Sequence, residues 1–138
     1  MVTLIFKGMS SYLNIYLKVK NKEMKEPSFI LLDSFSRNSD IYQSVDEQGN
    51  FYSIDGQKRE LTNGIFQDIL EDLQGQINNC QLYIDTAREV KSPDVQDIVE
   101  QRKYLKELES TRDYFNFLYG ILKDREYNDI EGIYCFID

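Results

Sequence analysis

Apolar residues recur at helical spacing along two long segments in the second half of the chain. The first stripe is formed by Phe66, Ile69, Leu70, Leu73, Ile77, Cys80, Tyr83, Ile84, Ala87 and Val90. The second is formed by Ile98, Leu105, Leu108, Phe115, Tyr119 and Leu122. Residues three, four and seven apart share one face of a helix. The stripes therefore predict two long helices, folded back on each other as an antiparallel hairpin over residues 62–124.

The expected ends of these helices carry residues that satisfy free backbone amides. Thr62 or Asn63 is suited to cap the first helix, because a short polar side chain accepts hydrogen bonds from the first turn. For the second helix we expect Ser92 as the cap and Pro93 at the first helical position, where a missing N–H is tolerated. The turn between the helices is thus predicted at residues 91–94.

Three polar residues, Gln76, Gln101 and Arg112, interrupt the two stripes. Polar residues in a helical seam set register or partner at a cost in stability. At about 1.5 Å per residue, each helix spans roughly 35–45 Å, which is long for a chain of this size. The stripes predict intramolecular core. The far half, near Tyr83 to Tyr104, is also where we expect a second copy or a bound partner.

Alternating apolar and polar residues before the hairpin predict strands. We expect strands at residues 2–6, 12–19 and 28–32, the third of them more buried, and a β-hairpin at 41–45 and 51–54 with its turn at 46–50. A closing strand at residues 132–137 must pair within the N-terminal sheet to be stable. The expected fold class is α+β: a small, mostly antiparallel sheet of four to six strands, packed with the helical hairpin. We expect one domain over residues 1–138, strand-rich over 1–61.

The net charge of −8 comes from 24 acids and 16 bases. Such a balance disfavours direct binding of nucleic acid and favours a basic partner. No apolar run reaches the length of a membrane span, and the first residues do not resemble a signal peptide. Cys80 and Cys135 are expected to be reduced and buried, with a disulfide between them as the alternative. Reduced thiols make the cytoplasm the predicted location.

The sequence contains no motif that points to a reaction. Histidine is absent, which removes the commonest general base and imidazole metal ligand. Neither zinc spacing nor a glycine-rich phosphate loop is present, so we expect no metal and no cofactor. Carboxylates at the predicted turns leave a hydrolase as an alternative; they are Asp40, Asp46, Glu47, Asp55, Asp129 and Glu131.

Basic and aromatic side chains supply the candidate ligand or partner residues. They are Lys58, Arg59, Tyr83, Arg88, Lys91, Arg102 and Tyr104. Arginine and lysine bind phosphates, and tyrosine supplies contact area and a hydrogen bond at low entropic cost.

From the residues we expect a non-enzymatic acidic interaction protein. The closest functional class is an inhibitor, an immunity protein or a phage anti-defence antagonist that binds a protein partner. This expectation rests on class-level analogy. An oligomer formed through the helical hairpin, which sequesters a nucleotide or another small ligand, is the first alternative. A carboxylate-dependent hydrolase is the second.

Overall fold

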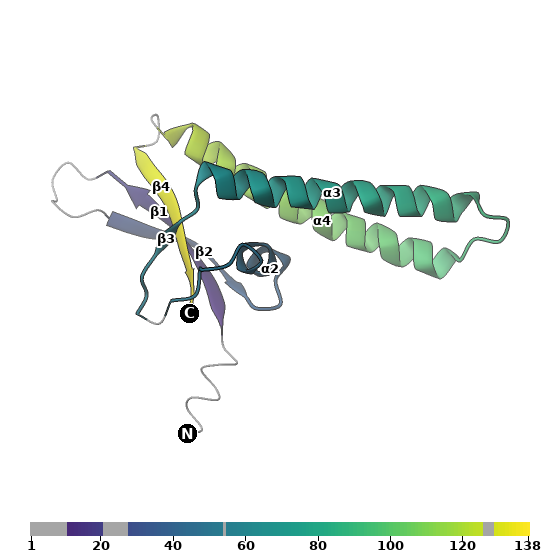
Figure 1. Ribbon diagram of the computed structural model, residues 1–138, viewed down its shortest axis with the longest axis horizontal. Helices are drawn as coiled ribbons and strands as arrows, with labels where there is room; N and C mark the ends of the chain where they lie inside the picture. The colour runs from purple at the N-terminus through teal and green to yellow at the C-terminus, as the bar shows by residue number, and fades with distance from the viewer. Residues whose placement is uncertain (1–10, 21–27, 54, 126–128) are drawn as a thin grey trace, which may run out of the picture.

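The structure is a computed structural model that describes residues 11–20, 28–53, 55–125 and 129–138. It contains a four-stranded antiparallel sheet and a long helical hairpin, which confirms the α+β prediction (Figure 1). In chain order the elements are β1 (Tyr12–Val19), β2 (Ser28–Ser36), α2 (Asp40–Asp46), β3 (Arg59–Glu60), α3 (Asn63–Glu89), α4 (Val95–Lys123) and β4 (Ile130–Ile137).

The strands are ordered β2-β1-β4-β3, so the last strand of the chain is central in the sheet. β4 pairs antiparallel with both β1 and β3, which confirms that the closing strand joins the N-terminal strands. Side chains alternate across the sheet as the period of two requires. Leu13 and Ile15 of β1 are fully buried on the inner face, whereas Tyr16 and Lys18 belong to the outer face.

β2 was expected to be a buried strand, and this prediction was wrong. It is an edge strand, and Ile30 and Leu31 remain 53% and 54% exposed. A bulge shifts the register, since Ile15 pairs with Asp33 while the next residue, Tyr16, pairs with Leu31. An apolar run of this kind reads as buried in a sequence, because periodicity does not reveal whether a strand has one neighbour or two.

The predicted strand at residues 41–45 is also wrong, because this segment forms α2. Ser39 caps the helix by accepting a hydrogen bond from the Ile41 amide, and Tyr42 and Val45, three residues apart, bury the same face. Instead of a second hairpin strand, Tyr52 makes an isolated parallel bridge with Ile137. The predicted turn residue Gly49 does adopt a positive φ of 75°. The strand predicted at 2–6 lies outside the described residues.

α3 and α4 form the predicted hairpin. Thr62 caps α3 by accepting from the Ile65 amide, as expected. The predicted cap of α4 needs correction by two residues: Asp94, not Ser92, caps this helix by accepting from the Asp97 amide. Pro93 therefore lies outside the helix. Aspartate and serine are about equally good caps, so the sequence alone does not decide between Asp94 and Ser92.

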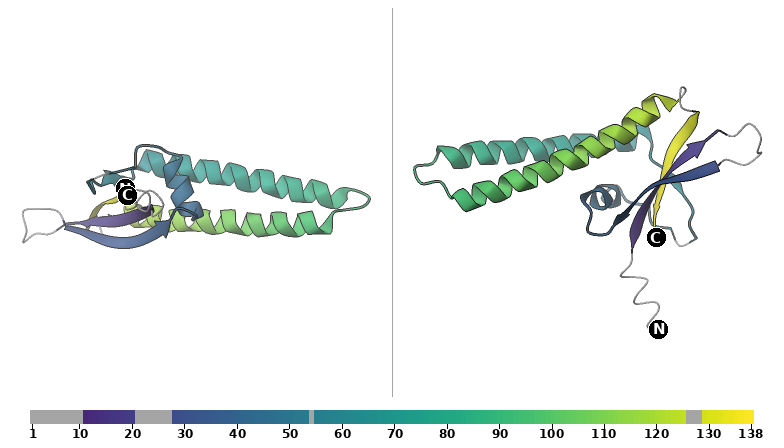
Figure 2. Two further views of the ribbon diagram at one scale, coloured as in Figure 1. Left: turned by 90° about the horizontal axis from the view of Figure 1, so that it is seen from below. Right: turned by 180° about the vertical axis from the view of Figure 1, so that it is seen from behind.

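The halves of the hairpin have different surroundings. Near the sheet, Phe66 of α3 and Phe115 and Leu118 of α4 are fully buried in one core with the inner faces of β1 and β4. Farther on, α3 and α4 extend past the sheet and past α2, and this is visible in all three views (Figures 1 and 2). Neither α2, α3 nor α4 is long and apolar enough to cross a membrane.

Candidate functional site

The seven residues predicted from the sequence fall into two groups. Lys58 and Arg59 lie beside the sheet, at the start of β3. The others lie in the half of the hairpin that projects from the sheet; they are Tyr83, Arg88, Lys91, Arg102 and Tyr104. We call the part from Gln76 to Lys106 the arm. The sequence candidates therefore do not form one site.

Polar contacts join the two helices along one side of the arm. The Tyr83 hydroxyl donates to Asp97 at 2.6 Å, and the Tyr104 hydroxyl donates to Gln76 at 3.3 Å. Between them, the Cys80 thiol donates to the Gln101 carbonyl at 3.4 Å. The hydrogen bond to Asp97 raises the pKa of Tyr83. The polar interruptions of the stripes thus hold the register of the hairpin, while the tyrosine rings stay about half exposed.

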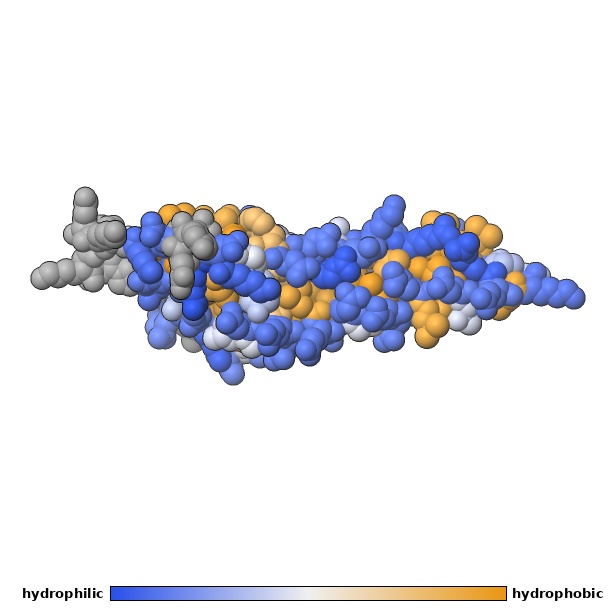
Figure 3. Space-filling model, turned by 90° about the horizontal axis from the view of Figure 1, so that it is seen from above, coloured by the Kyte–Doolittle hydropathy of each residue, from blue (hydrophilic) through white to orange (hydrophobic). Residues whose placement is uncertain are grey.

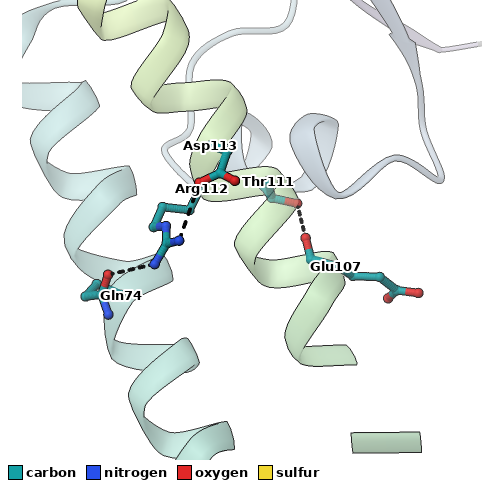
Figure 4. Close-up of polar contacts among 5 residues, drawn as sticks. All are labelled: Gln74, Glu107, Thr111, Arg112 and Asp113. Atoms are coloured by element: carbon teal, nitrogen blue, oxygen red, sulfur yellow. Dashed lines mark hydrogen bonds and ion pairs between the residues drawn. The ribbon is translucent and has the colours of Figure 1, made fainter. Parts of the chain in front are cut away.

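A further contact near the base of the arm involves the third interruption. Arg112 reaches across from α4 and donates to Gln74 of α3 at 3.4 Å, while its other nitrogen meets Asp113 (Figure 4). Beside it, the buried Thr111 hydroxyl donates to the Glu107 carbonyl at 2.9 Å (Figure 4). Arg112 therefore links the helices instead of facing a ligand.

The basic residues of the arm do not gather into one pocket. Arg102 lines a shallow groove between the helices with Asp85 and Gln81. Arg88 lines a separate depression with Asp85 and Glu89, and Lys91 is exposed in the turn. A phosphate needs several donors that converge. Within one copy, the described residues of the arm therefore form no composite phosphate site, and a pocket between two copies stays a prediction.

Six of the twelve large apolar side chains that are exposed in the described part of the chain lie on the arm. They are Leu82, Tyr83, Val90, Val95, Val99 and Tyr104. Figure 3 shows hydrophobic atoms between the polar flanks of the hairpin and again toward its far end. Within residues 76–106 the chain carries five acids and five bases, so the net charge of −8 resides outside the arm. The arm is thus a neutral, partly apolar projection from an acidic body.

The outer face of the sheet carries a cluster of aromatic rings that the sequence analysis did not single out. We call Tyr16, Phe29, Tyr134 and Phe136 the outer-face rings. Lys58 places its ammonium nitrogen 4.6 Å from the centre of the Tyr16 ring and 4.9 Å from that of Phe29. In the sequence, the alternation of Tyr134 and Phe136 with Ile133 and Cys135 already indicates that the two rings share one face of β4. That Tyr16 and Phe29 join them follows only from the strand order, which the sequence does not give.

Arg59 faces the opposite way from Lys58, as neighbouring residues of an extended segment do. Its guanidinium lies 5.3 Å from the centre of the Phe51 ring and donates to the Asn50 carbonyl at 3.1 Å. Burial raises the pKa of the Cys135 thiol well above its ordinary value, and the nearby Arg59 charge opposes this only in part. Arg59 thus ties the 50–60 segment to the sheet, and Cys135 is not an activated nucleophile.

A hollow of about 440 Å³ lies between α2 and α4 and is the place where carboxylate chemistry could be sought. Asp40 and Glu107 line it together with Lys103 and Lys106. Both carboxylates are exposed to solvent, whereas a catalytic pair of carboxyl groups is expected to converge in a site that excludes water. Among the residues that the structure describes, no group of three or more carboxylates or thiols could hold a metal ion. Within the described part of the chain, this hollow gives the hydrolase alternative no supporting geometry.

Comparisons with known proteins found no matching family model, no matching curated protein and no matching solved structure.

Proposed function

We propose that this chain is a non-enzymatic interaction protein that binds a protein partner through the arm. The observation that carries the proposal is the contrast between the two halves of the hairpin. Close to the sheet, most apolar side chains of α3 and α4 fill the core, with Phe117 as an exposed exception. Along the arm, by contrast, Val95 is 69% exposed and Leu82 is 67% exposed, although both occupy regular helices.

Exposed apolar side chains on a projecting element are typical of protein interfaces. Val95 and Val99 lie one helical turn apart and share a face of α4, whereas Tyr104, five residues after Val99, lies on another side of the helix. The register of the arm is already held by polar contacts within the hairpin. A partner would thus meet a preformed surface, which lowers the ordering cost of binding.

Electrostatics adds a preference for the kind of partner. Because the arm is neutral and the remainder carries the negative charge, the body would attract a basic protein while the arm makes the contact. An inhibitor or antagonist of a basic enzyme, such as a nuclease, fits this division. Two free, buried thiols support a cytoplasmic setting for this activity.

A matched pair of variants tests the proposal. Val95→Ser combined with Val99→Ser removes two exposed apolar side chains of the arm. Phe117→Ser removes a similarly exposed side chain, 55% accessible, from the same helix nearer the sheet. Each purified chain would be used to capture proteins from an extract of its native cells, and captured proteins would be quantified by mass spectrometry.

We expect the wild type and Phe117→Ser to retain the same protein, and the double valine variant to retain at least about tenfold less of it. Light scattering measures the molar mass of each chain alone. A dimer of the wild type would show that the occupant of the arm is a second copy of this chain. Equal capture by all three chains, each of them monomeric, would contradict a role for the arm.

A further inference from the structure

The outer face of the sheet holds a cage of aromatic rings around the Lys58 ammonium, and the Lys18 ammonium lies at its edge, 5.4 Å from the centre of the Tyr134 ring. The rings of Tyr16 and Phe136 stack with centres 5.8 Å apart and planes inclined by 12°. Phe29 stands nearly perpendicular to Tyr16 and to Tyr134, with interplanar angles of 85° and 82°. The rings come from β1, β2 and β4, so the sheet itself fixes the cage.

Lys58 fills this cage. Its nitrogen lies 4.6 Å, 4.9 Å and 5.8 Å from the ring centres of Tyr16, Phe29 and Phe136. Among the described residues Lys58 forms no ion pair, although the chain contains more acids than bases. The negative ring faces are therefore its only described electrostatic partners.

Carboxylates border the cage on its β3 and β4 side. Alternation along β3 places Glu60 on the same face as Lys58, and a side chain at Gly132 would meet Glu60 Oε1 at 3.3 Å and the Tyr134 ring at 3.2 Å. Because Gly132 has no side chain, the Glu60 carboxylate and the Tyr134 ring can both lie over β4. Glu131 is adjacent and pairs with Lys18 at 3.4 Å.

This combination selects a cation. Several rings around an ammonium form the arrangement that recognises alkylated ammonium groups. Lys18 offsets the charge of Glu131, and the Glu60 carboxylate favours a positive occupant over an anion. Lys58 belongs to the short lead-in to β3, whereas the rings belong to paired strands. Withdrawal of Lys58 would leave the cage intact and open to solvent.

We propose that the outer-face rings are a binding site for an alkylammonium side chain of a basic protein partner, and that Lys58 occupies this site in the unbound chain as an internal competitor. The site is separate from the arm, so each proposal stands or fails independently of the other. A partner lysine, plain or methylated, supplies the required group.

Choline serves as the probe, and 3,3-dimethyl-1-butanol serves as its neutral analogue of the same shape. Binding is followed by NMR shifts of the assigned ring protons of Tyr16, Phe29 and Phe136. We expect Lys58→Ala to bind choline about tenfold more tightly than the wild type does, and to bind the neutral analogue more weakly than choline. Adding Tyr16→Leu to Lys58→Ala should abolish the choline shifts.

Lys58→Gln, which keeps most of the side-chain length, replaces Lys58→Ala if the alanine variant does not give a native circular-dichroism spectrum. N-acetyl-trimethyllysine amide and N-acetyl-lysine amide then report whether the cage prefers a methylated ammonium. A folded Lys58 variant that shows no choline shifts, or that binds the neutral analogue equally well, would overturn the proposal.

Discussion

The base of the hairpin is tied to the edge of the sheet by a partly buried polar contact. The Tyr114 hydroxyl of α4 donates to Asp33 of β2 at 2.6 Å, and the Tyr114 ring packs against Phe35 with centres 5.1 Å apart. Tyr114→Phe removes the hydroxyl and keeps the ring. It therefore measures the hydrogen bond without disturbing the aromatic packing.

The expected loss follows from the acceptor and the burial. A hydrogen bond to a charged group contributes about 1.5–3 kcal/mol, and its removal leaves a partly buried carboxylate without this donor. We expect Tyr114→Phe to lower the free energy of unfolding by about 2 kcal/mol. With a urea dependence of about 2 kcal/mol per molar, the midpoint falls by roughly 1 M.

Urea titrations followed by circular dichroism at pH 7 measure this difference. Tyr104→Phe is the matched control, because its hydroxyl makes a longer, neutral contact of 3.3 Å and its ring is exposed. We expect this control to change the free energy of unfolding by less than about 0.5 kcal/mol. If both variants unfold within 0.5 kcal/mol of the wild type, Tyr114 does not tie the base of the hairpin to the sheet as the geometry indicates.

The same contact has a pH signature. Burial, and then the hydrogen bond to Asp33, raise the pKa of Tyr114 above its ordinary value. An unfolded tyrosine titrates near about pH 10. A group with a raised folded-state pKa contributes stability that is fully present below its unfolded pKa and is lost above it. The difference between wild type and Tyr114→Phe should therefore be constant from pH 7 to about 9 and should shrink above about 10.

Three further changes test local features of the fold. Asp94→Ala should cost about 1 kcal/mol in urea unfolding, whereas Ser92→Ala should cost less than about 0.5, because Asp94 is the residue that caps α4; the reverse order would restore Ser92 as the cap. Both thiols should resist a thiol reagent in the native chain at pH 8 and react after denaturation, because burial raises the pKa of Cys80 and of Cys135; fast native labelling would contradict their burial. Gly49→Ala should cost about 1 kcal/mol in thermal unfolding, because the φ of 75° disfavours a side chain; an unchanged midpoint would show that the turn adapts.

The long-range arrangement of the hairpin was predictable, because helical periodicity extends over many residues. The stripe residues Phe66, Ile77 and Phe115 are indeed buried. The short elements were not predictable in this way. Residues 41–45 are β-prone, yet Ser39 and the spacing of Tyr42 and Val45 produce a helix. Local capping and tertiary contacts override a five-residue propensity.

The candidate sites were predictable only in part. The charges and tyrosines of the arm could be read from the sequence, as could the presence of Lys58. The cage could not, because it requires β1, β2 and β4 to be neighbours in a specific register, which places Tyr16 opposite Tyr134. Strand order depends on contacts between distant segments, and a single sequence does not encode those contacts in its periodicity.

Side-chain footprinting of the captured complex tests the central claim, that the arm is the interaction surface. Hydroxyl-radical oxidation of Leu82, Val95 and Val99 would be compared between the free chain and the complex, with Phe117 as an internal reference of similar exposure. We predict strong protection of the three arm residues and little change at Phe117. Oxidation of the arm at the free-chain rate within a stable complex would contradict the claim.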